Sequence, residues 1–357
     1  MRKTNFIFKT LLVLGVLTFV SCSDSDNNSV PRGDYENGIL ISGEGSGAGS
    51  GSVSYISYDY TVEESRIFNK VNSSDLGTYL QSISFDSDRA YIVVDLQNSV
   101  TVVDRYTFEE LGKITEDLSN PRYMEVVGNR GYITNWGDGS NENDDFVAIV
   151  DINSFELIEK INVANGPERI VHNNGKLYVS HKGAYSTNNI ISIINLTDNS
   201  IDTITVKDNP DEISFNSNNQ LVVLSEGRTI YDASYNVIGH TLAGITTINI
   251  QSNEIVSEVV FDEGIHPSLM DIDNETLYYS IGNNIYKINI DDSSPSTTVL
   301  LSAAEGYLYG MSVENGMLYS ADASFTDVSK LNIFNLASNN IVKTLDAPLG
   351  ASKIYFN

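Results

Sequence analysis

The sequence predicts an all-β fold, a seven-bladed β-propeller with four-stranded antiparallel blades, because two repeated features share one period. Strands that begin with proline start at Pro121, Pro167, Pro210 and Pro267. A proline at the first residue of a strand removes no ladder hydrogen bond. Apolar strands end in an acidic or amide residue at Asp104, Asp151, Asn195, Asn249, Asn289 and Asn335. A period of about 40–45 residues is that of a four-stranded propeller blade.

Each repeat consists of the proline-led strand, a tight turn, a tyrosine-rich strand, a variable loop, an apolar strand, a second turn and a last strand. Third strands such as 146–152 are almost continuously apolar, which is typical of strands buried on both faces. Asp and Asn at their ends favour tight turns, because these side chains accept hydrogen bonds from the backbone two residues on. Full units are expected to begin near residues 80, 121, 167, 210, 267 and 309.

The two ends of the chain supply the seventh unit. Residues 38–70 contain only strands two to four of the repeat, and the chain ends in a lone first strand at 352–356. We expect these segments to form one blade, because their pairing removes a free sheet edge and closes the ring. One propeller domain, 37–357, then accounts for the chain beyond its N-terminal segment, with an insertion at 225–244.

The N-terminal segment, residues 1–21, is predicted to be a lipoprotein signal peptide. Arg2, Lys3 and Lys9 precede an apolar run over residues 11–20, which is shorter than the ~20 residues that cross a bilayer as a helix. A small residue, Ser21, directly precedes Cys22 and resembles a lipoprotein cleavage box. An ordinary signal peptide with an incidental cysteine is the alternative.

Lipidation of Cys22 would attach several acyl chains, which is sufficient for stable anchoring. Residues 22–36 are polar, and acidic at their start, so we expect a lipidated, disordered tether there. Acidic residues directly after the cysteine resemble the surface-export signals of Bacteroidota lipoproteins. The expected location is the outer membrane, with a lipid anchor and the domain facing the cell exterior.

Composition excludes several classes of function. The chain has 47 acidic and 21 basic residues and a formal net charge of -26, whereas nucleic-acid surfaces need clustered cations. Its one cysteine is at position 22, so no disulfide, zinc-thiolate site or cysteine nucleophile is expected in the folded part. With four histidines in the chain, redox-metal chemistry has few ligands, and no cofactor or metal is expected.

One face of the ring is predicted to be the working face. The loops between strands two and three, and those between blades, are long and varied, whereas the other loops are short. Function is concentrated on variable loops held by a rigid scaffold. Aromatic side chains offer contact area, and a few polar groups orient a ligand. The candidate ligand-binding residues of this face are Glu44, Asp95, Arg122, Trp136, His181, Lys182, Tyr185, Glu226, Arg228, His266, Tyr307 and Asp322.

Some of these residues have structural alternatives. Tyr307 and its neighbour Tyr309 could pack between blades, and the same holds for Trp136. Residues 138–145 alternate oxygen-bearing side chains in the manner of a calcium loop. They lack the glycine at the sixth position of an EF-hand loop and its distant bidentate glutamate. A solvated acidic loop is therefore favoured over a metal site.

The proline-led strand, the tyrosine-rich second strand and the Asx-ended third strand resemble the YncE-like seven-bladed propellers. The opening segment 38–45 and the Gly/Ser-rich loop before 51–55 look like the Bacteroidota lipoprotein branch that carries the DUF5074 domain. The resemblance covers residues 37–357. Some members of that branch, the BtuG type, are surface cobalamin-binding lipoproteins that pass corrinoids to a TonB-dependent transporter. The resemblance therefore implies a nutrient ligand such as cobalamin, a TonB-dependent transporter as partner, and an otherwise monomeric protein.

Three functions remain open from the sequence. The first is a tethered protein that binds a large ligand on the loop-rich face and assists its uptake. The second is a propeller enzyme of the lactonase or lyase type, whose candidate residues at the central channel are Glu44, Asp95, Glu226, His181 and His266. The third is a protein-binding scaffold or adhesin. Neither a sialidase Asp-box nor a histidine-rich lyase pattern occurs, so no catalytic residue is assigned and binding is favoured over an enzymatic role.

Overall fold

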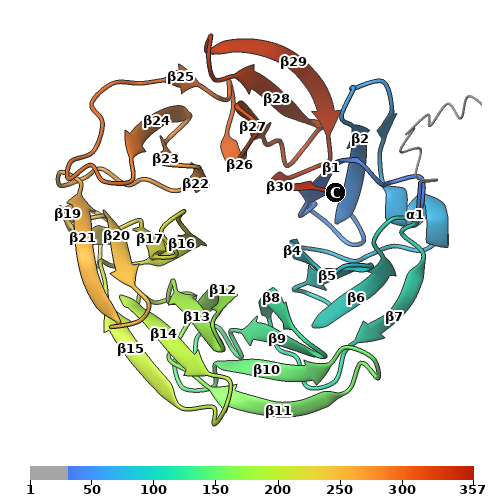
Figure 1. The fold of residues 1–357 in the computed structure, drawn as a ribbon, viewed down its shortest axis with the longest axis horizontal. Helices are drawn as coiled ribbons and strands as arrows, with labels where there is room; N and C mark the ends of the chain where they lie inside the picture. The colour runs from blue at the N-terminus through green and yellow to red at the C-terminus, as the bar shows by residue number, and fades with distance from the viewer. Residues whose placement is uncertain (1–30) are drawn as a thin grey trace, which may run out of the picture. The chain divides into compact units, whose positions relative to one another are not determined.

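A computed structural model describes residues 31–357 of the chain. The predicted signal peptide (1–21), Cys22 and the tether up to residue 30 lie outside these described residues. Within residues 32–357, which form one compact unit, seven four-stranded antiparallel sheets are arranged in a ring (Figure 1). The region along the axis of this ring is called the channel. The predicted seven-bladed propeller is confirmed.

The strands occur in chain order, and six blades run from the innermost strand outwards. The first three blades of this kind are β4 (Leu80–Phe85), β5 (Arg89–Val94), β6 (Ser99–Asp104) and β7 (Glu110–Ile114); β8 (Pro121–Val127), β9 (Arg130–Asn135), β10 (Phe146–Asp151) and β11 (Leu157–Asn162); and β12 (Pro167–Asn173), β13 (Lys176–His181), β14 (Ile190–Asn195) and β15 (Ile201–Thr205). The next three are β16 (Pro210–Phe215), β17 (Leu221–Ser225), β20 (Gly244–Asn249) and β21 (Glu254–Val260); β22 (Met270–Asp273), β23 (Thr276–Ile281), β24 (Asn284–Asn289) and β25 (Leu301–Ser302); and β26 (Leu308–Glu314), β27 (Met317–Asp322), β28 (Ser329–Asn335) and β29 (Asn340–Ala347).

The turn chemistry inferred from the repeats is present at the third strands. All six of the predicted Asp and Asn residues end a third strand. Asp104 shows the geometry, since its Oδ1 accepts hydrogen bonds from the backbone N–H groups of Tyr106 at 2.9 Å and Thr107 at 2.8 Å. The other five Asx side chains likewise accept from the amide two residues on. One difference is that β22 begins at Met270, beyond Pro267.

Both chain ends build the seventh blade. It consists of β30 (Ala351–Phe356) at the channel, then β1 (Gly38–Gly43), β2 (Ser52–Ser57) and the short outer strand β3 (Glu63–Glu64). β1 and β30 are antiparallel, with Ile41 opposite Ile354. The helix α1 (Ile67–Asn72) follows β3 and buries Ile67 and Phe68. Because of this pairing β1 is an inner strand of its sheet, and β30 lies at the channel like the innermost strands of the other blades.

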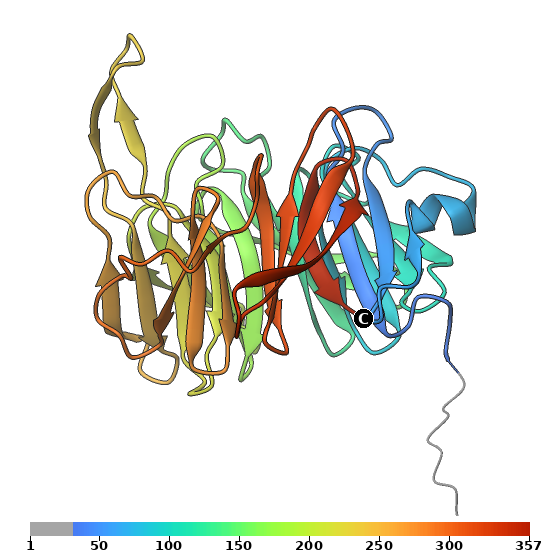
Figure 2. The same ribbon diagram turned by 90° about the horizontal axis from the view of Figure 1, so that it is seen from above.

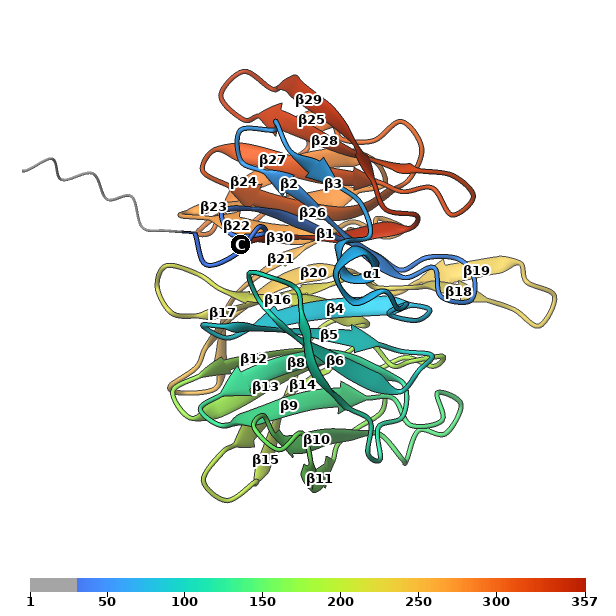
Figure 3. The same cartoon turned by 90° about the vertical axis from the view of Figure 1, so that its right-hand side faces the viewer.

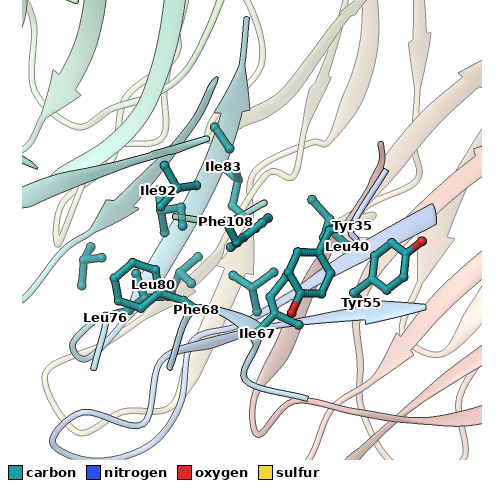
Figure 4. Close-up of a cluster of buried hydrophobic side chains, with 14 residues drawn as sticks. Tyr35, Leu40, Tyr55, Ile67, Phe68, Leu76, Leu80, Ile83, Ile92 and Phe108 are labelled. Atoms are coloured by element: carbon teal, nitrogen blue, oxygen red, sulfur yellow. The ribbon is translucent and has the colours of Figure 1, made fainter. Parts of the chain in front are cut away.

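The hydrophobic core lies between neighbouring blades. Figure 4 shows one such cluster, in which side chains from the closing blade meet α1 and the blade of β4–β7. Tyr35 belongs to this cluster and is 3% exposed. Its ring meets those of Tyr55 and Phe108 edge-on, with centroids 5.4 Å and 5.7 Å away. Residues 32–36 therefore belong to the folded unit, which corrects the prediction that the disordered tether extends to residue 36.

The two faces of the ring differ. The insertion at 225–244 forms a hairpin of β18 (Thr229–Tyr231) and β19 (Val237–His240), which extends beyond the loop-rich face (Figures 2 and 3). The folded unit begins on the opposite face, where the Arg32 guanidinium lies 3.6 Å from the ring centroid of Tyr106. No helix among the described residues is long and apolar enough to cross a membrane.

Removing residues 351–357 tests the closure of the ring. We expect loss of cooperative urea unfolding, because β1 then has an open edge and a blade lacks its innermost strand. Deletion of residues 229–240, with a short Gly-Ser link in their place, is the matched control and should leave the unfolding midpoint unchanged. A truncated chain that unfolds at the wild-type urea concentration would contradict the closure.

Candidate functional site

Three innermost strands carry charged side chains at the mouth of the channel. The first residues of these strands pair irregularly with the neighbouring strand. In β8 the pairing register shifts between Pro121 and Met124. The same shift follows Pro167 in β12 and Pro210 in β16. An irregularity of this kind bends a strand and re-aims its side chains. The charged residues at these shifts are Arg122, Glu168, Arg169, Asp211 and Glu212.

Buried hydroxyl groups stabilise these irregular segments and connect one blade to the next. Thr134 in β9 accepts a hydrogen bond from the Tyr123 amide at 3.0 Å and donates to the Glu168 carbonyl at 2.7 Å. Ser180 in β13 accepts from the Arg169 amide at 3.1 Å and donates to the Asp211 carbonyl at 2.9 Å. The backbone that carries the charged side chains is therefore held by its own blade and by its neighbour.

Arg122 is clamped between two carboxylates. Its Nη1 lies 3.2 Å from Asp95 Oδ2, and its Nη2 lies 3.0 Å from Glu168 Oε1. Burial raises the pKa of Asp95, although the positive charge of Arg122 opposes the shift. A guanidinium that forms two ion pairs at a largely buried position has little freedom to move.

A second group of ion pairs continues around the channel. Lys182 Nζ lies 2.7 Å from Asp211 Oδ2 and 3.1 Å from Glu226 Oε1. Arg169 Nε lies 3.2 Å from the other oxygen of Asp211, and its Nη2 pairs with Glu212. Burial raises the pKa of Glu226 to about 7. Burial acts in the same direction on Asp211, but Lys182 and Arg169 outweigh it and hold the pKa of Asp211 below its ordinary value.

Aromatic side chains cover the first of these ion clusters. The guanidinium carbon of Arg122 lies 3.8 Å from the ring centroid of Trp136, which is the distance of a cation–π contact. Trp136 meets Tyr185 edge-on at 6.1 Å. Tyr185 is 82% exposed, and the indole Nε1 of Trp136 is buried without a hydrogen-bond partner among the described residues. A rigid aromatic surface thus faces the solvent above a fixed cation.

Glu44 and Tyr307 meet at the other side of the mouth through Tyr309. The Tyr309 hydroxyl donates to Glu44 Oε1 at 3.0 Å. The rings of Tyr307 and Tyr309 stack with centroids 5.3 Å apart. Tyr309 is half-buried and bonded to another blade, whereas Tyr307 is largely exposed. The inter-blade packing that the sequence left open thus applies to Tyr309, and Tyr307 adds a second exposed ring to the face.

The structure does not place His181 where a ligand could reach it. His181 is 0% exposed, and its ring nitrogens lie 3.2 Å from the Asn165 carbonyl and 2.8 Å from Ser192 Oγ. Burial lowers the pKa of His181 to about 4. The side chain is therefore a neutral part of the core under neutral conditions.

The other predicted histidine, His266, supports the loop that carries Glu226. Its Nδ1 donates to the Glu226 carbonyl at 2.8 Å, so its Nε2 is an acceptor when the ring is neutral. That nitrogen lies 2.9 Å from Nδ1 of His240 at the end of β19. The two histidines thus connect the base of the projecting hairpin to the site.

Arg228 and Asp322 also position loops. Arg228 pairs with Asp208, with 3.3 Å between Nε and Oδ2, at the base of the hairpin. The carboxylate of Asp322 accepts from the backbone amides of Glu305 at 2.9 Å and Tyr307 at 2.9 Å. Of the twelve predicted ligand-binding residues, these two and both histidines act in this structure through the segments that they hold.

Sequence reasoning missed the partners of the predicted cations. Glu168, Arg169, Asp211 and Glu212 are absent from the prediction although each lies one or two residues after a strand-leading proline. These residues could have been found from their position directly after that proline, because equivalent positions in the blades of a propeller lie around one channel. Only the packing of the ring reveals which of these residues form pairs.

Metal binding finds no support in the acidic loop at 138–145. Asp138 Oδ1 accepts from the Ser140 amide at 3.1 Å, and Asp144 Oδ2 accepts from the Asp138 amide at 3.1 Å. Among residues 31–357 no group of three or more His, Cys, Asp or Glu side chains is arranged to hold a metal ion. These carboxylates instead fix the conformation of the loop.

Two cavities stand out in the described part of the chain. One, of about 220 Å³, lies in the channel below the site and is lined by Arg169, Glu212 and Lys353 among others. The other, of about 450 Å³, lies between the closing blade and residues 346–349. The larger cavity has none of the clustered, oppositely charged pairs described above, so the channel mouth is the better candidate site despite its smaller volume.

Replacing Lys182 tests the stability of the ion cluster. In Lys182→Met, Glu226 loses its cation and Asp211 keeps only Arg169. We expect the free energy of unfolding to fall by about 1–3 kcal/mol, less than the ~3–5 kcal/mol of a fully buried pair because Lys182 is 34% exposed. The exposed pair Lys330–Asp346 provides the control, since Lys330→Met should leave the free energy of unfolding almost unchanged. Equal losses in urea unfolding of the two variants would contradict the cluster.

Asp145 should make stability depend on pH. Its Oδ1 accepts from the Gly166 amide at 2.8 Å, and burial raises the pKa of Asp145 from 3.8 to about 6. The folded protein then binds this proton more tightly than the unfolded chain, so the contribution of Asp145 to stability is greatest below about pH 4 and declines as the pH rises from about 4 to 6. Asp145→Asn should remove this part of the decline in urea titrations. An identical pH profile in the variant would show that another group is responsible.

Comparison with known proteins agrees with the fold. The model of the family described as "Domain of unknown function (DUF5074)" matches residues 37–347. No curated protein matches the sequence.

Solved structures show similar folds at low sequence identity. The dihydro-heme d1 dehydrogenase NirN in complex with DHE has a TM-score of 0.58 at 15% identity, over 92% of this chain and 77% of that one. Hydrazine synthase of Kuenenia stuttgartiensis has a TM-score of 0.56 at 17% identity, over 78% and 91%. The computationally designed protein Ika8 has a TM-score of 0.57 at 10% identity, over 92% of each chain. These similarities concern the fold alone, and the family match shows that the chain belongs to the DUF5074 family of β-propellers.

Proposed function

We propose that this protein is a lipid-anchored outer-membrane protein that binds a large ligand on the loop-rich face and assists its uptake through a TonB-dependent transporter. The observation that carries the proposal is the aromatic surface above a fixed cation, in which Trp136 covers Arg122 and the exposed Tyr185 meets Trp136. Rigid aromatic rings provide contact area with little loss of conformational entropy on binding. Exposed Tyr307 on the same face extends that area.

Binding is proposed in preference to catalysis because the charged groups are fixed by one another. Arg122, Arg169 and Lys182 each contact two carboxylates. A general acid or base must be free to reach the substrate, and Glu168, Asp211 and Glu226 are all occupied by these cations. Such a network preserves the shape of a recognition surface.

The proposed location rests on the lipoprotein features of residues 1–22. The described part of the chain begins beside Tyr106, on the face opposite the hairpin of β18 and β19 (Figure 2). The resemblance to the BtuG-type branch makes a corrinoid the first ligand to test, and the same resemblance suggests the transporter as partner.

A lipid-free form comprising residues 29–357 allows the ligand to be tested by calorimetry and by fluorescence of Trp136, the single tryptophan of the chain. Cobalamin, haem and glycans are the ligands to titrate. We expect one of them to change the Trp136 emission, and Trp136→Ala to weaken its binding at least tenfold, as for a central aromatic contact.

The control is Tyr58→Ala, which removes an exposed tyrosine next to β2 on the opposite face and should leave the affinity unchanged. No binding of any of these ligands, together with no partner recovered from native membranes, would refute the proposed function. Equal loss of affinity in both variants would place the ligand elsewhere.

A further inference from the structure

Lys353 differs from the other three cations at the channel. It lies on the innermost strand β30, yet among residues 31–357 it forms no ion pair, and its amine has no hydrogen-bond partner there. Arg122, Arg169 and Lys182 in contrast each hold two carboxylates. Lys353 is therefore a positive charge inside the ring that no neighbouring side chain directly neutralises.

The amine faces the channel cavity of about 220 Å³. Its Nζ lies 5.9 Å from the ring centroid of Tyr123. The guanidinium carbon of Arg169 lies 4.7 Å from the same centroid. Two cations that line the cavity thus lie near one aromatic ring, and their combined charge favours an anion between or beside them.

A second unpaired group lines the same cavity. Ser352 is buried, and its Oγ has no hydrogen-bond partner in the described part of the chain. Buried polar groups in native proteins are normally satisfied by protein, water or a ligand. Burial, and then the charge of Arg169, lower the pKa of Lys353, and the charges of Glu44, Glu212 and Asp211 only partly oppose this shift.

The carboxyl groups of the cavity are already engaged. Asp271 Oδ2 accepts from the Val313 amide at 2.7 Å and from Ser312 Oγ at 3.0 Å. Glu212 pairs with Arg169. The negative charges of Glu44, Glu212 and Asp211 favour the charged form of Lys353, but none of these carboxylates forms an ion pair with its amine among residues 31–357.

We propose that Lys353 and Ser352 form an anion-binding subsite in the channel, which takes a carboxylate or phosphate group. The subsite adds to the proposed function. It depends on that proposal in one respect, namely that the ligand enters from the loop-rich face. Its volume suits such a group and excludes a large ligand, so the anion is either an acidic arm of the ligand or a free small ion. Both would be held by the ammonium charge and by the serine hydroxyl as a donor.

The test uses acetate and inorganic phosphate as probes, with chloride exchanged to keep the ionic strength constant, at pH 6. We expect the melting temperature of the lipid-free protein to rise with either probe, because a ligand that binds only the folded state stabilises it. Lys353→Met should abolish that rise. Without a probe, this variant should melt no lower than the wild type, because it removes a half-buried charge that forms no ion pair.

Lys182→Met is the matched control, since it removes a paired cation: it should melt lower than the wild type and still respond to the probes. Equal responses of wild type and Lys353→Met would overturn the subsite. A loss of stability in Lys353→Met as large as in Lys182→Met would also overturn it, because it would show that the ammonium is already paired.

The source of the anion follows from the ligand identified through Trp136 fluorescence. Weaker binding of that ligand to Lys353→Met supports an acidic arm, whereas unchanged binding together with a lost acetate response supports a free ion. If a ligand binds but neither probe stabilises the wild type, the subsite is wrong and the proposed function stands. If the probes bind but no ligand does, the reverse holds.

Discussion

The pairing of β1 with β30 is the constraint on which the rest of the structure depends. It joins the two ends of the folded unit in one sheet and completes the ring. The same pairing places Glu44 directly after β1 and Lys353 opposite Ser42. The channel therefore carries groups from both chain ends beside groups from the middle of the chain, such as Arg122 and Asp211. The circular arrangement of the blades brings these groups together although they are far apart in the sequence.

Burying the ion network at the mouth of the channel has an electrostatic cost in free energy, which opposes the stabilisation from packing between blades. Burying charges is unfavourable unless they are paired and hydrogen-bonded, and this ring pairs Arg122, Arg169 and Lys182 twice each. Apolar clusters between neighbouring blades supply the compensating stability. A surface held in this way changes little when it meets a ligand, which limits the entropy lost on binding.

Most of the fold could be predicted from the sequence, because its signals are local and repeated. Turn residues such as Asp104 and Asn335 act through hydrogen bonds to neighbouring amides, so their spacing alone locates the third strands. The start of the folded unit was harder to predict. Tyr35 lies in a polar stretch, and its burial depends on Tyr55 and Phe108, which only the folded chain brings near.

The candidate site could be predicted in part for the same reason. Residues at strand ends, such as Trp136 and Glu226, were found because the repeat fixes the face on which they lie. His181 was also selected by its strand-end position, yet its ring turns inward to Ser192. The pairing of Arg122 with Glu168 joins adjacent blades, and nothing in the local sequence of either residue encodes that contact.

Hydrogen exchange of the terminal strands, followed by mass spectrometry, tests the central claim most directly. If β1 and β30 close the ring, their amides should exchange only with the global unfolding of the propeller, at the same rate as amides of β8, β12 and β16. Exchange of β1 and β30 well before those inner strands would contradict the account. It would mean that the ring opens at its joined ends while the remaining blades stay folded.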